Sequence, residues 1–264
     1  MTVDPAHGQL PFLVRLDWGL DGARAIAPGT STTVVVDVLS FTTTVSVALD
    51  AGIDVLPYPA SDAGGVDHAV AHDAVLAVPR SSAGPGDVSL SPASLRAARG
   101  IRRLVLPSPN GSTIAAHLSG SGRGVLAASL RNATAIAEWI TAQHGPDGAP
   151  VAVVPSGERW PGGTLRPAVE DLWGAGAVVV GLLERGWTSA SPEARTAAAA
   201  FREVRAGLGA QLRSCASGAE LIAAGHPHDV DVAAELDLSR CVPALQTSVF
   251  RDVSRPPQGA PRRA

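Results

Sequence analysis

TTVVVDVLSFTTT, residues 32–44, carries the strongest structural signal in this chain. Its three consecutive valines lead straight into Asp37, and a short β-branched run between polar residues is typical of a strand buried on both faces. The segment 42–52 begins with threonines, spaces its apolar residues helically and ends at a glycine, which predicts a helix. Asp37 then lies at the carboxyl end of a strand beside a helix N-terminus. There it can bind a hard cation, with phosphate at the helix N-terminus, or it can simply cap the following loop.

Strand-like and helical segments alternate through the rest of the chain. The expected strands cover 10–17, 53–58, 74–78, 103–106, 124–128 and 149–154. The expected helices cover 113–118, 133–144, 167–184, 191–212, 217–224 and 230–236, with a helical turn at 68–71 and connections at 18–28 and 155–166. Such alternation indicates an α/β fold whose largely parallel sheet has helices on both faces. We expect one domain over residues 1–253 and a disordered tail over 254–264.

The segment 79–92, PRSSAGPGDVSLSP, is long for a loop in a compact domain and rich in glycine, serine and proline. Loops of this length are usually functional or mobile. Because Arg80 stands at its start, we expect this loop to close over a bound anion.

The composition restricts the function classes. A formal net charge of −3 and a pI near 6.1 give no electrostatic footprint for nucleic acid or an anionic membrane. All 21 basic residues are arginine, so no lysine can form a Schiff base or serve a P-loop. The N-terminus lacks the charged start and apolar core of a signal peptide, and no apolar stretch is long enough to span a membrane. We therefore expect a cytoplasmic protein with a small phosphorylated or anionic substrate, for which a homodimer is an allowed state.

Polar residues follow four of the expected strands, and the carboxyl ends of parallel strands meet at one edge of a sheet. Beside Asp37 and Thr42 to Thr44 they are Ser108, Asn110, Ser112, Arg131, Asn132, Glu158, Arg159 and Arg166. Glu170 and Asp171 fall near the start of the helix that begins at Pro167. Acids there complement the dipole of any helix, but beside Asp37 they favour a divalent-cation site. The carboxylates suit Mg²⁺, and the hydroxyls, amides and guanidinium groups suit phosphate.

Several familiar hydrolase patterns do not occur in the sequence. A haloacid-dehalogenase-type phosphatase needs a second Asp two residues after the first, where this chain has Leu39. Neither a G-x-S-x-G elbow nor a Walker loop is present. Cys215 and Cys241 are expected to be buried free thiols, and His226 and His228 to be loop residues rather than zinc ligands.

Five segments stand in a characteristic order along the chain. They are DVLSFTTT (37–44), PNGST (109–113), RNATAIA (131–137), AVEDLWGAGAVV (168–179) and HDVDVAAELDLSRCVPAL (228–245). Together they resemble the 2-phosphosulfolactate phosphatase family of coenzyme M biosynthesis, over roughly residues 14–249. The resemblance implies a three-layer α/β/α fold with a parallel or mixed sheet. It also implies a Mg²⁺-dependent phosphatase acting on a small phosphorylated hydroxy acid.

The resemblance and the expected sheet edge together assign roles to residues. Asp37, Glu170 and Asp171 are the expected catalytic residues and the expected ligands of Mg²⁺. The expected substrate-binding residues are Thr43, Thr44, Arg80, Asn110, Gly111, Ser112, Asn132, Arg159 and Arg166. The attacking group can be a metal-activated water or Asp37 itself.

Three departures from the family pattern bear on specificity. Ser40 stands where the family has an arginine after DVL, Pro79 where it has an acid, and Leu90 where it has an asparagine. Without a cation at position 40 we expect poor turnover of the sulfonate-bearing substrate. The arginines expected to compensate are Arg131, Arg159 and Arg166, whereas Arg24, in the early connection, is the expected bystander.

Two rival interpretations follow from the same departures. The first is a non-catalytic protein that binds small anions on the same fold, which the loss of charged groups at Ser40 and Pro79 favours. The second is another metal-assisted hydrolase on the same scaffold. A screen for phosphatase activity with and without Mg²⁺ distinguishes these two rivals from the Mg²⁺-dependent phosphatase.

Overall fold

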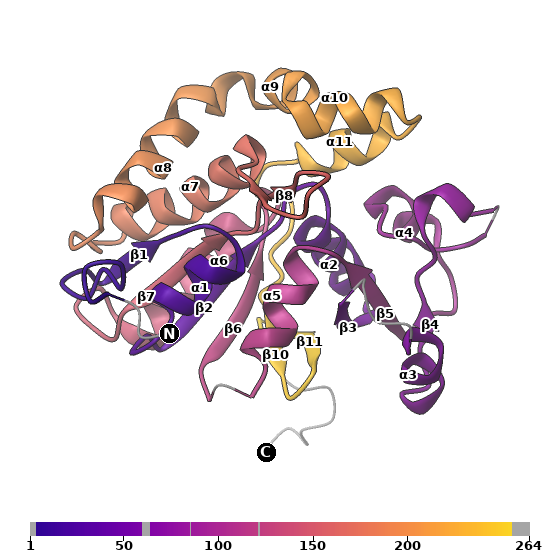
Figure 1. The fold of residues 1–264 in the computed structure, drawn as a ribbon, viewed down its shortest axis with the longest axis horizontal. Coiled ribbons are helices and arrows are strands. Elements are labelled where there is room, and N and C mark those ends of the chain that lie inside the picture. The colour runs from indigo at the N-terminus through magenta and orange to yellow at the C-terminus, as the bar shows by residue number, and fades with distance from the viewer. Residues whose placement is uncertain (1–3, 60–63, 85, 121, 255–264) are drawn as a thin grey trace, which may run out of the picture.

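The computed structural model describes residues 4–59, 64–84, 86–120 and 122–254. These residues form an α/β fold in which a mixed, mostly parallel sheet of nine strands is flanked by helices (Figure 1). The strand order is β1-β7-β2-β6-β10-β11-β3-β5-β4. The strands of this sheet are β1 (Val14–Leu16), β2 (Thr32–Val36), β3 (Asp54–Pro59), β4 (Val75–Leu76), β5 (Arg103–Ser108), β6 (Gly124–Ala128), β7 (Val151–Pro155), β10 (Pro243–Gln246) and β11 (Val249–Asp252).

Most helices follow strands, as the alternating pattern predicts. The helices are α1 (Gly19–Ile26), α2 (Phe41–Asp50), α3 (Gly65–Ala71), α4 (Pro92–Ala97), α5 (Gly111–Leu118), α6 (Ala133–His144), α7 (Val169–Glu184), α8 (Pro192–Val204), α9 (Leu208–Ser214), α10 (Ala216–Ala223) and α11 (Pro227–Ala233). Two short 3₁₀ helices are η1 (Arg80–Ser82) and η2 (Arg205–Gly207). Helices α8 to α11 form an arch that passes over α7 and reaches α4, and α3 lies beyond α4 at the edge of the molecule (Figure 1).

Strand β2 is the centre of one half of the sheet, as its valine run predicts. It pairs in parallel with β6 on one side and with β7 on the other, along its whole length. Every residue of β2 is buried: Val34 and Val36 belong to one apolar cluster and Val35 to another. Both faces of the strand are therefore covered, which is why a continuous apolar run suits it.

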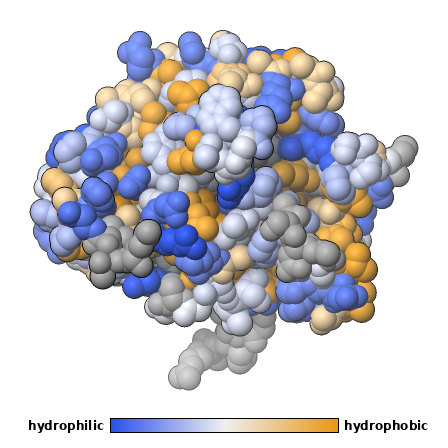
Figure 2. Space-filling view, viewed as in Figure 1, coloured by the Kyte–Doolittle hydropathy of each residue, from blue (hydrophilic) through white to orange (hydrophobic). Residues whose placement is uncertain are grey.

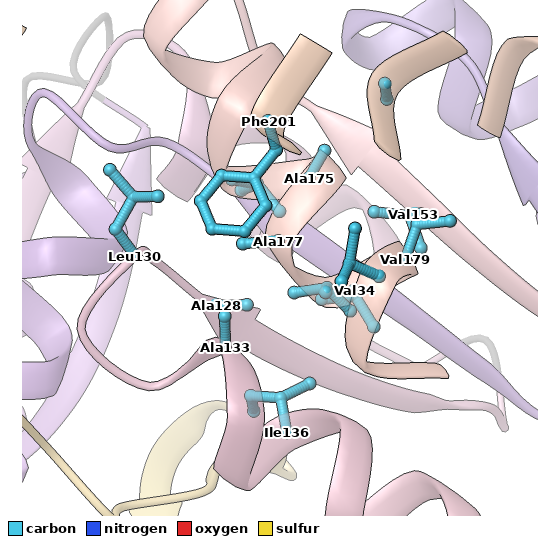
Figure 3. Packing of buried hydrophobic residues seen from close by; sticks show 14 of the residues in the cluster. Val34, Ala128, Leu130, Ala133, Ile136, Val153, Ala175, Ala177, Val179 and Phe201 are labelled. Carbon is cyan, nitrogen blue, oxygen red and sulfur yellow. The ribbon is translucent and has the colours of Figure 1, made fainter. Parts of the chain in front are cut away.

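One face of the sheet is covered by α6 and α7, and α8 packs on the outside of α7. Figure 3 shows Val34, Ala177 of α7 and Phe201 of α8 in this cluster. The two helices approach closely because α7 has a glycine at the contact: a Cβ on Gly176 would lie 2.1 Å from the carbonyl oxygen of Ala197. This side of the sheet thus carries two successive layers of helix.

The opposite face is covered by α1, α2 and α5. Ile26, Val45 and Ile114, one from each helix, share a buried cluster with Val35. The distal edge of the sheet carries α3, which contacts β4 and β5. The prediction of an α/β fold with helices on both faces of the sheet is therefore confirmed.

The sequence analysis missed two strands in the middle of the sheet. The hairpin of β10 and β11 inserts between β6 and β3 and pairs antiparallel with both. Each contact has a single register pair, Ala244 with Leu126 and Phe250 with Val55. Both strands have only four residues, and β10 begins with Pro243, so their alternation is too short to be recognised in the sequence.

Three expected loops also contain regular structure. The connection at 18–28 forms α1, and the polar loop at 155–166 contains the two-stranded hairpin of β8 (Glu158–Arg159) and β9 (Leu165–Arg166). The loop at 79–92 begins with η1, and Val78 forms an isolated bridge with Ser89. Both ends of that loop are therefore tied to the body of the protein.

Two further expectations concern the ends and surroundings of the chain. The expected tail lies outside the described residues, apart from Ser254. No described helix combines the length and the apolar character that a bilayer crossing requires.

The exposed apolar residues Val66 and Val70 lie on α3, and Figure 2 shows apolar surface at that end of the molecule.

Candidate active site

Asp37 directly follows β2, and backbone amides hold both of its carboxylate oxygens. The Phe41 amide donates to Oδ1 at 3.1 Å, and the Gly111 amide donates to Oδ2 at 2.9 Å. Phe41 is the first residue of α2 and Gly111 the first of α5. Two helix N-termini therefore meet at one buried carboxylate, which brings together two of the loops predicted to share this edge.

Gly111 is required for this close approach. A Cβ at that position would lie 2.6 Å from Cδ1 of Phe41 and 2.7 Å from Oδ2 of Asp37. Any larger residue would push the loop away from the carboxylate and break the amide bond. Gly111 was predicted to bind substrate, and its visible contact is with Asp37.

Asp171 fastens two further loops to the same place. Its Oδ1 accepts a hydrogen bond from the Val38 amide at 2.7 Å, and its Oδ2 accepts one from the Gly157 amide at 2.8 Å. It lies in the first turn of α7 next to Glu170, and both side chains are buried. Asp171 thus joins the loop after β2 to the loop after β7.

Glu158 is a fourth acid in this group. The Asn110 side chain donates from Nδ2 to Oε2 of Glu158 at 2.8 Å, which joins the loop after β5 to the hairpin of β8 and β9. The sequence analysis placed Glu158 at this edge without giving it a role. Its position directly after a buried strand, like that of Asp37, was the signal that could have identified it.

Three of these acids, Asp37, Glu158 and Asp171, have a raised pKa. Burial raises the pKa of Asp37, and the charge of Glu170 adds to the rise against two opposing amide bonds. Burial, followed by the charges of Asp37 and Glu170, raises the pKa of Asp171 well above its ordinary value. Burial and the charge of Asp37 raise the pKa of Glu158 to about 7. In the described part of the chain, no arginine or histidine forms an ion pair with any of these four carboxylates.

Such a concentration of oxygen donors suits a hard divalent cation, although the acids do not form a closed cage. Across residues 4–59, 64–84, 86–120 and 122–254, no three of His, Cys, Asp and Glu converge closely enough to hold one ion. Mg²⁺ commonly takes one or two carboxylates and completes its coordination with water and substrate phosphate. A carboxylate has about four acceptor positions, so the two amide bonds of Asp37 leave it able to bind a cation. The residues present therefore fit Mg²⁺.

Arg80 places a positive charge at the same edge. Its Nη2 donates to Oγ of Ser40 at 2.6 Å and to the carbonyl oxygen of Leu90 at 3.2 Å. Burial is the main influence on the pKa of Asp37, and the charge of Arg80 acts against it. Ser40 stands where the family pattern has an arginine, but its hydroxyl accepts a hydrogen bond from Arg80, so an arginine from another loop lies at this position.

A cleft of about 390 Å³ opens beside the acids, between α1, α5 and the hairpin of β8 and β9. Asn110 and Glu158 line it, as do Arg24 of α1 and Arg159 of β8. The connection expected around Arg24 is helix α1, which places Arg24 on this cleft, and the weaker effect expected for Arg24→Ala stays a prediction. Ser156 also lines the cleft, and its buried hydroxyl has no hydrogen-bond partner among the described residues.

The loop that carries Arg131 and Asn132 was also predicted to lie at this edge, but its arginine points away from the acids. Arg131 is buried and donates to Ser46 at 3.0 Å and to Asp50 at 2.9 Å, and it also pairs with Glu235. Arg131 therefore does not compensate for the missing arginine at position 40. The amide of Asn132 bonds within its own loop and to the backbone of Cys241, so its predicted contact with substrate stays a prediction.

The remaining predicted residues mainly support the loops. Thr43 and Thr44 donate to the carbonyl oxygens of Val38 and Leu90, each at 2.8 Å. The hydroxyl of Ser112 donates to the carbonyl oxygens of Tyr58 at 2.6 Å and of Ser108 at 2.7 Å. Arg166 contacts Ser217 at 3.2 Å and stacks over Trp160, with 5.8 Å from its guanidinium carbon to the ring centroid.

The cysteines supply no nucleophile. Both are buried free thiols, as predicted. Burial raises the pKa of Cys215 to about 12, and the neighbouring Glu170 adds to the rise. Burial also raises the pKa of Cys241 to about 12. Neither forms a thiolate near neutral pH.

Two comparisons with known proteins cover the region that contains these residues. A family model described as 2-phosphosulpholactate phosphatase matches residues 23–248. The chain is also similar to a protein of Deinococcus radiodurans named "Probable 2-phosphosulfolactate phosphatase". The two are 33% identical over 217 residues, which cover 80% of this chain and 86% of that protein. All four acids, both cleft arginines and Arg80 lie inside the matched residues.

Proposed function

This chain belongs to the 2-phosphosulfolactate phosphatase family, and on that premise we propose that it is a Mg²⁺-dependent phosphatase of a small phosphorylated hydroxy acid. Its family makes it a hydrolase whose substrate specificity is open. We place its activity in the cytosol. Neither nucleic acid nor membrane is a partner in this proposal, and a homodimer is compatible with it.

One observation carries the proposal: the buried acids Asp37, Glu170 and Asp171 and the partly buried Glu158 share one sheet edge, and none has an ion-pair partner among the described residues. Burial and the charges of neighbouring acids raise the pKa of Asp37, Glu158 and Asp171. A protein that keeps so much unneutralised negative charge in its interior gains stability from a bound cation. We propose that two carboxylates, those of Asp37 and Glu170, hold Mg²⁺ directly, and that the charge of the neighbouring Asp171 adds to the attraction for the cation.

When bound, Mg²⁺ neutralises phosphate charge and lowers the pKa of water. The chain supplies the remaining groups. The amides that open α2 and α5 fix the orientation of Asp37, so that it can accept a proton from the attacking water. Glu158, with a pKa of about 7, carries a proton for part of the time at neutral pH. It lines the cleft, where it can give that proton to the leaving oxygen.

We propose that water, rather than Asp37, attacks phosphorus. Both oxygens of Asp37 accept amide hydrogen bonds, which stabilise the carboxylate and reduce its nucleophilicity. A single turnover in ¹⁸O-labelled water should therefore place the label in phosphate. Recovery of the label in the peptide that contains Asp37 would instead identify a covalent intermediate.

The cleft suggests how the rest of the substrate is bound. Arg159 lines it together with Trp18 and Leu165, and Arg24 lines it paired with Asp21, so the cleft offers positive charge mainly from Arg159 beside apolar surface. We propose that this cleft takes the second acidic group of the substrate. Arg166 has a smaller part, because Ser217 and Trp160 already hold its guanidinium.

A substrate panel tests this function. We expect the protein to hydrolyse at least one small phosphorylated hydroxy acid in millimolar Mg²⁺ and to lose that activity in EDTA. Arg159→Ala should raise KM for a substrate with two acidic groups more than for one with phosphate alone, and Arg202→Ala, on exposed α8, is the matched control. Turnover that survives complete metal removal would contradict the role of Mg²⁺. Tight binding of phosphate without turnover of any ester would favour the anion-binding protein instead.

A further inference from the structure

We propose that Asp229 of α11 is a positioning residue, which holds the guanidinium of Arg80 as the positive wall of the anion site beside Asp37. This inference rests on the proposed function, since it names the group that faces the substrate phosphate. Arg80 and Asp229 are 149 positions apart in the chain. Their contact therefore depends on the docking of the helical arch over the loop 79–92.

Asp229 is almost fully buried, at 1% exposure, and its contacts tie together both ends of that loop. Its Oδ2 accepts from Nε of Arg80 at 3.1 Å. Its Oδ1 accepts from the hydroxyl of Ser91 at 2.5 Å and from the amide of Ala93 at 3.3 Å. One carboxylate thus fixes the arginine near the start of the loop and the serine near its end.

The other side of the guanidinium is held at the acid site. Nη2 of Arg80 donates to Ser40, three residues after Asp37, and to the carbonyl oxygen of Leu90. These bonds and the one to Asp229 use three of the five N–H groups of an arginine. In the described part of the chain no residue accepts a bond from Nη1. That nitrogen keeps two donors in a fixed orientation, as recognition of a phosphate oxygen requires.

The surroundings of Arg80 leave room for a ligand. A cavity of about 250 Å³ lies beside it, lined also by Ala77, Leu90 and Pro107. Arg80 is thus held between this cavity and the loop that carries Asp37. The chemical class that fits two fixed N–H donors beside a cation site is a tetrahedral oxyanion, here the phosphate of the substrate.

A buried ion pair seldom adds net stability, because desolvating two charges offsets most of their attraction. Structural need therefore does not by itself explain why this acid is buried against Arg80. Arg96 and Glu235 give a useful contrast: their ion pair also joins α4 to the region after α11, but it is partly exposed and distant in sequence from every acid-site residue. The pair of Asp229 and Arg80, in contrast, is bonded to Ser40, three residues after Asp37.

The test measures the affinity for inorganic phosphate, in Mg²⁺, by titration calorimetry. Asp229→Asn should raise Kd about tenfold, because the guanidinium loses a charged anchor while its own charge remains. Arg80→Lys keeps the positive charge but cannot reach both anchors, so it should lose at least as much affinity. The control Arg96→Gln should leave Kd within about twofold of the wild-type value.

A double-mutant cycle shows whether Asp229 acts through Arg80. In an Arg80→Gln background, Asp229→Asn should change Kd by less than about twofold. An equal loss in both backgrounds would overturn the proposal, as would unchanged phosphate binding in Asp229→Asn. If Asp229→Asn does not fold, Ser40→Ala removes the second anchor without leaving a buried charge. Ser40→Ala should then weaken phosphate binding, and no change in Kd would overturn the proposal.

Turnover measured on the same variants separates this inference from the proposed function. In Asp229→Asn, KM for a phosphomonoester should rise about tenfold while kcat changes less than about threefold. A wild-type protein that binds phosphate through Asp229 and Arg80 but hydrolyses no ester would contradict the phosphatase and leave the positioning role standing. An active phosphatase with unaltered KM in Asp229→Asn would support the phosphatase and contradict the positioning role of Asp229.

Discussion

Helix α2 has a group of charged side chains at each end, and the two groups balance their charge in opposite ways. At its C-terminus, the guanidinium of Arg131 is enclosed by Asp50, Glu235 and the hydroxyl of Ser46. At its N-terminus, Asp37 and the nearby Asp171 accept hydrogen bonds from backbone amides, Glu158 accepts one from the Asn110 side chain, and no described ion pair neutralises these acids or Glu170. In the first group the opposite charges of the side chains neutralise one another, whereas the second group needs a cation or a proton from outside the chain.

The contrast shows how a functional charge differs from a structural one. A buried arginine with two carboxylate partners is complete, and removing it leaves uncompensated acids. A group of acids that raise one another's pKa is incomplete, and a cation or a proton completes it. Both groups contain residues that the sequence analysis assigned to the active site. Only the structure shows which of these residues already have an oppositely charged partner within the chain.

The largest expected effect is on activity at the N-terminal group. Asp37→Asn removes the carboxylate that two helix N-termini orient, so kcat/KM should fall by about 10³-fold or more. The protein should still fold, because the amide oxygen can accept from Phe41 or Gly111. The matched control is Asp50→Asn at the other end of α2, which should retain activity within about threefold. Equal losses in both variants, measured on the best substrate, would abolish the distinction.

The second prediction concerns the C-terminal end of α2, where a substitution should reduce stability rather than activity. Arg131→Met removes a buried guanidinium from between the partly exposed carboxylates of Asp50 and Glu235, so the free energy of unfolding should fall by about 1.5–3 kcal/mol. Urea denaturation measures this loss. At a temperature where the variant is folded, its kcat/KM should stay within about threefold of the wild type. A stable Arg131→Met variant with impaired turnover would place Arg131 in the active site after all.

The third prediction concerns pH. The folded pKa of Glu158 is about 7, above its ordinary value of 4.5, so the folded state binds this proton more tightly than the unfolded state does. Without metal, stability should therefore be greatest below pH 4.5 for this group and should fall as pH rises towards 7, by at most about 3 kcal/mol. Glu158→Gln should flatten the part of the profile nearest pH 7. Parallel profiles for both proteins in EDTA would show that Glu158 does not titrate there.

The smallest expected effect is the response to metal. Mg²⁺ at ten times its Kd should stabilise the folded state by about 1.4 kcal/mol. For a chain of this size that corresponds to a rise in Tm of roughly 3–5 °C. Asp37→Asn should lose this rise, whereas Arg131→Met should show it from a lower starting Tm. A rise that persists in Asp37→Asn would locate the cation elsewhere.

The sequence predicted most of the sheet because its strands carry strong local signals. The valine run of β2 and the alternating segments 124–128 and 133–144 have the observed bounds or nearly so. Helix α1 was missed because Gly19 and Gly22 weaken its helical pattern. The hairpin of β10 and β11 was missed because its partners, β6 and β3, lie far away in the chain.

The candidate site was partly predictable for a related reason. Position after a strand places a residue near one edge of a sheet, and this was enough to bring Asp37, Asn110 and Glu158 together. It does not show which partner a long side chain reaches. Arg131 turns to Asp50, and Arg80 reaches Ser40 from a different loop. Such pairings depend on packing between distant segments, which no local pattern encodes.

The insertion of β10 and β11 between β6 and β3 also has a consequence for synthesis on the ribosome. In the described chain the two halves of the sheet share no direct strand pairing, and residues 243–252 join them. Those residues are translated after every other strand. Until they emerge, the edges of β6 and β3 carry unpaired backbone groups in a nascent chain whose other strands are already made. We therefore expect the sheet to close only near the end of translation, and chaperones that shield exposed strand edges to be needed most in that interval.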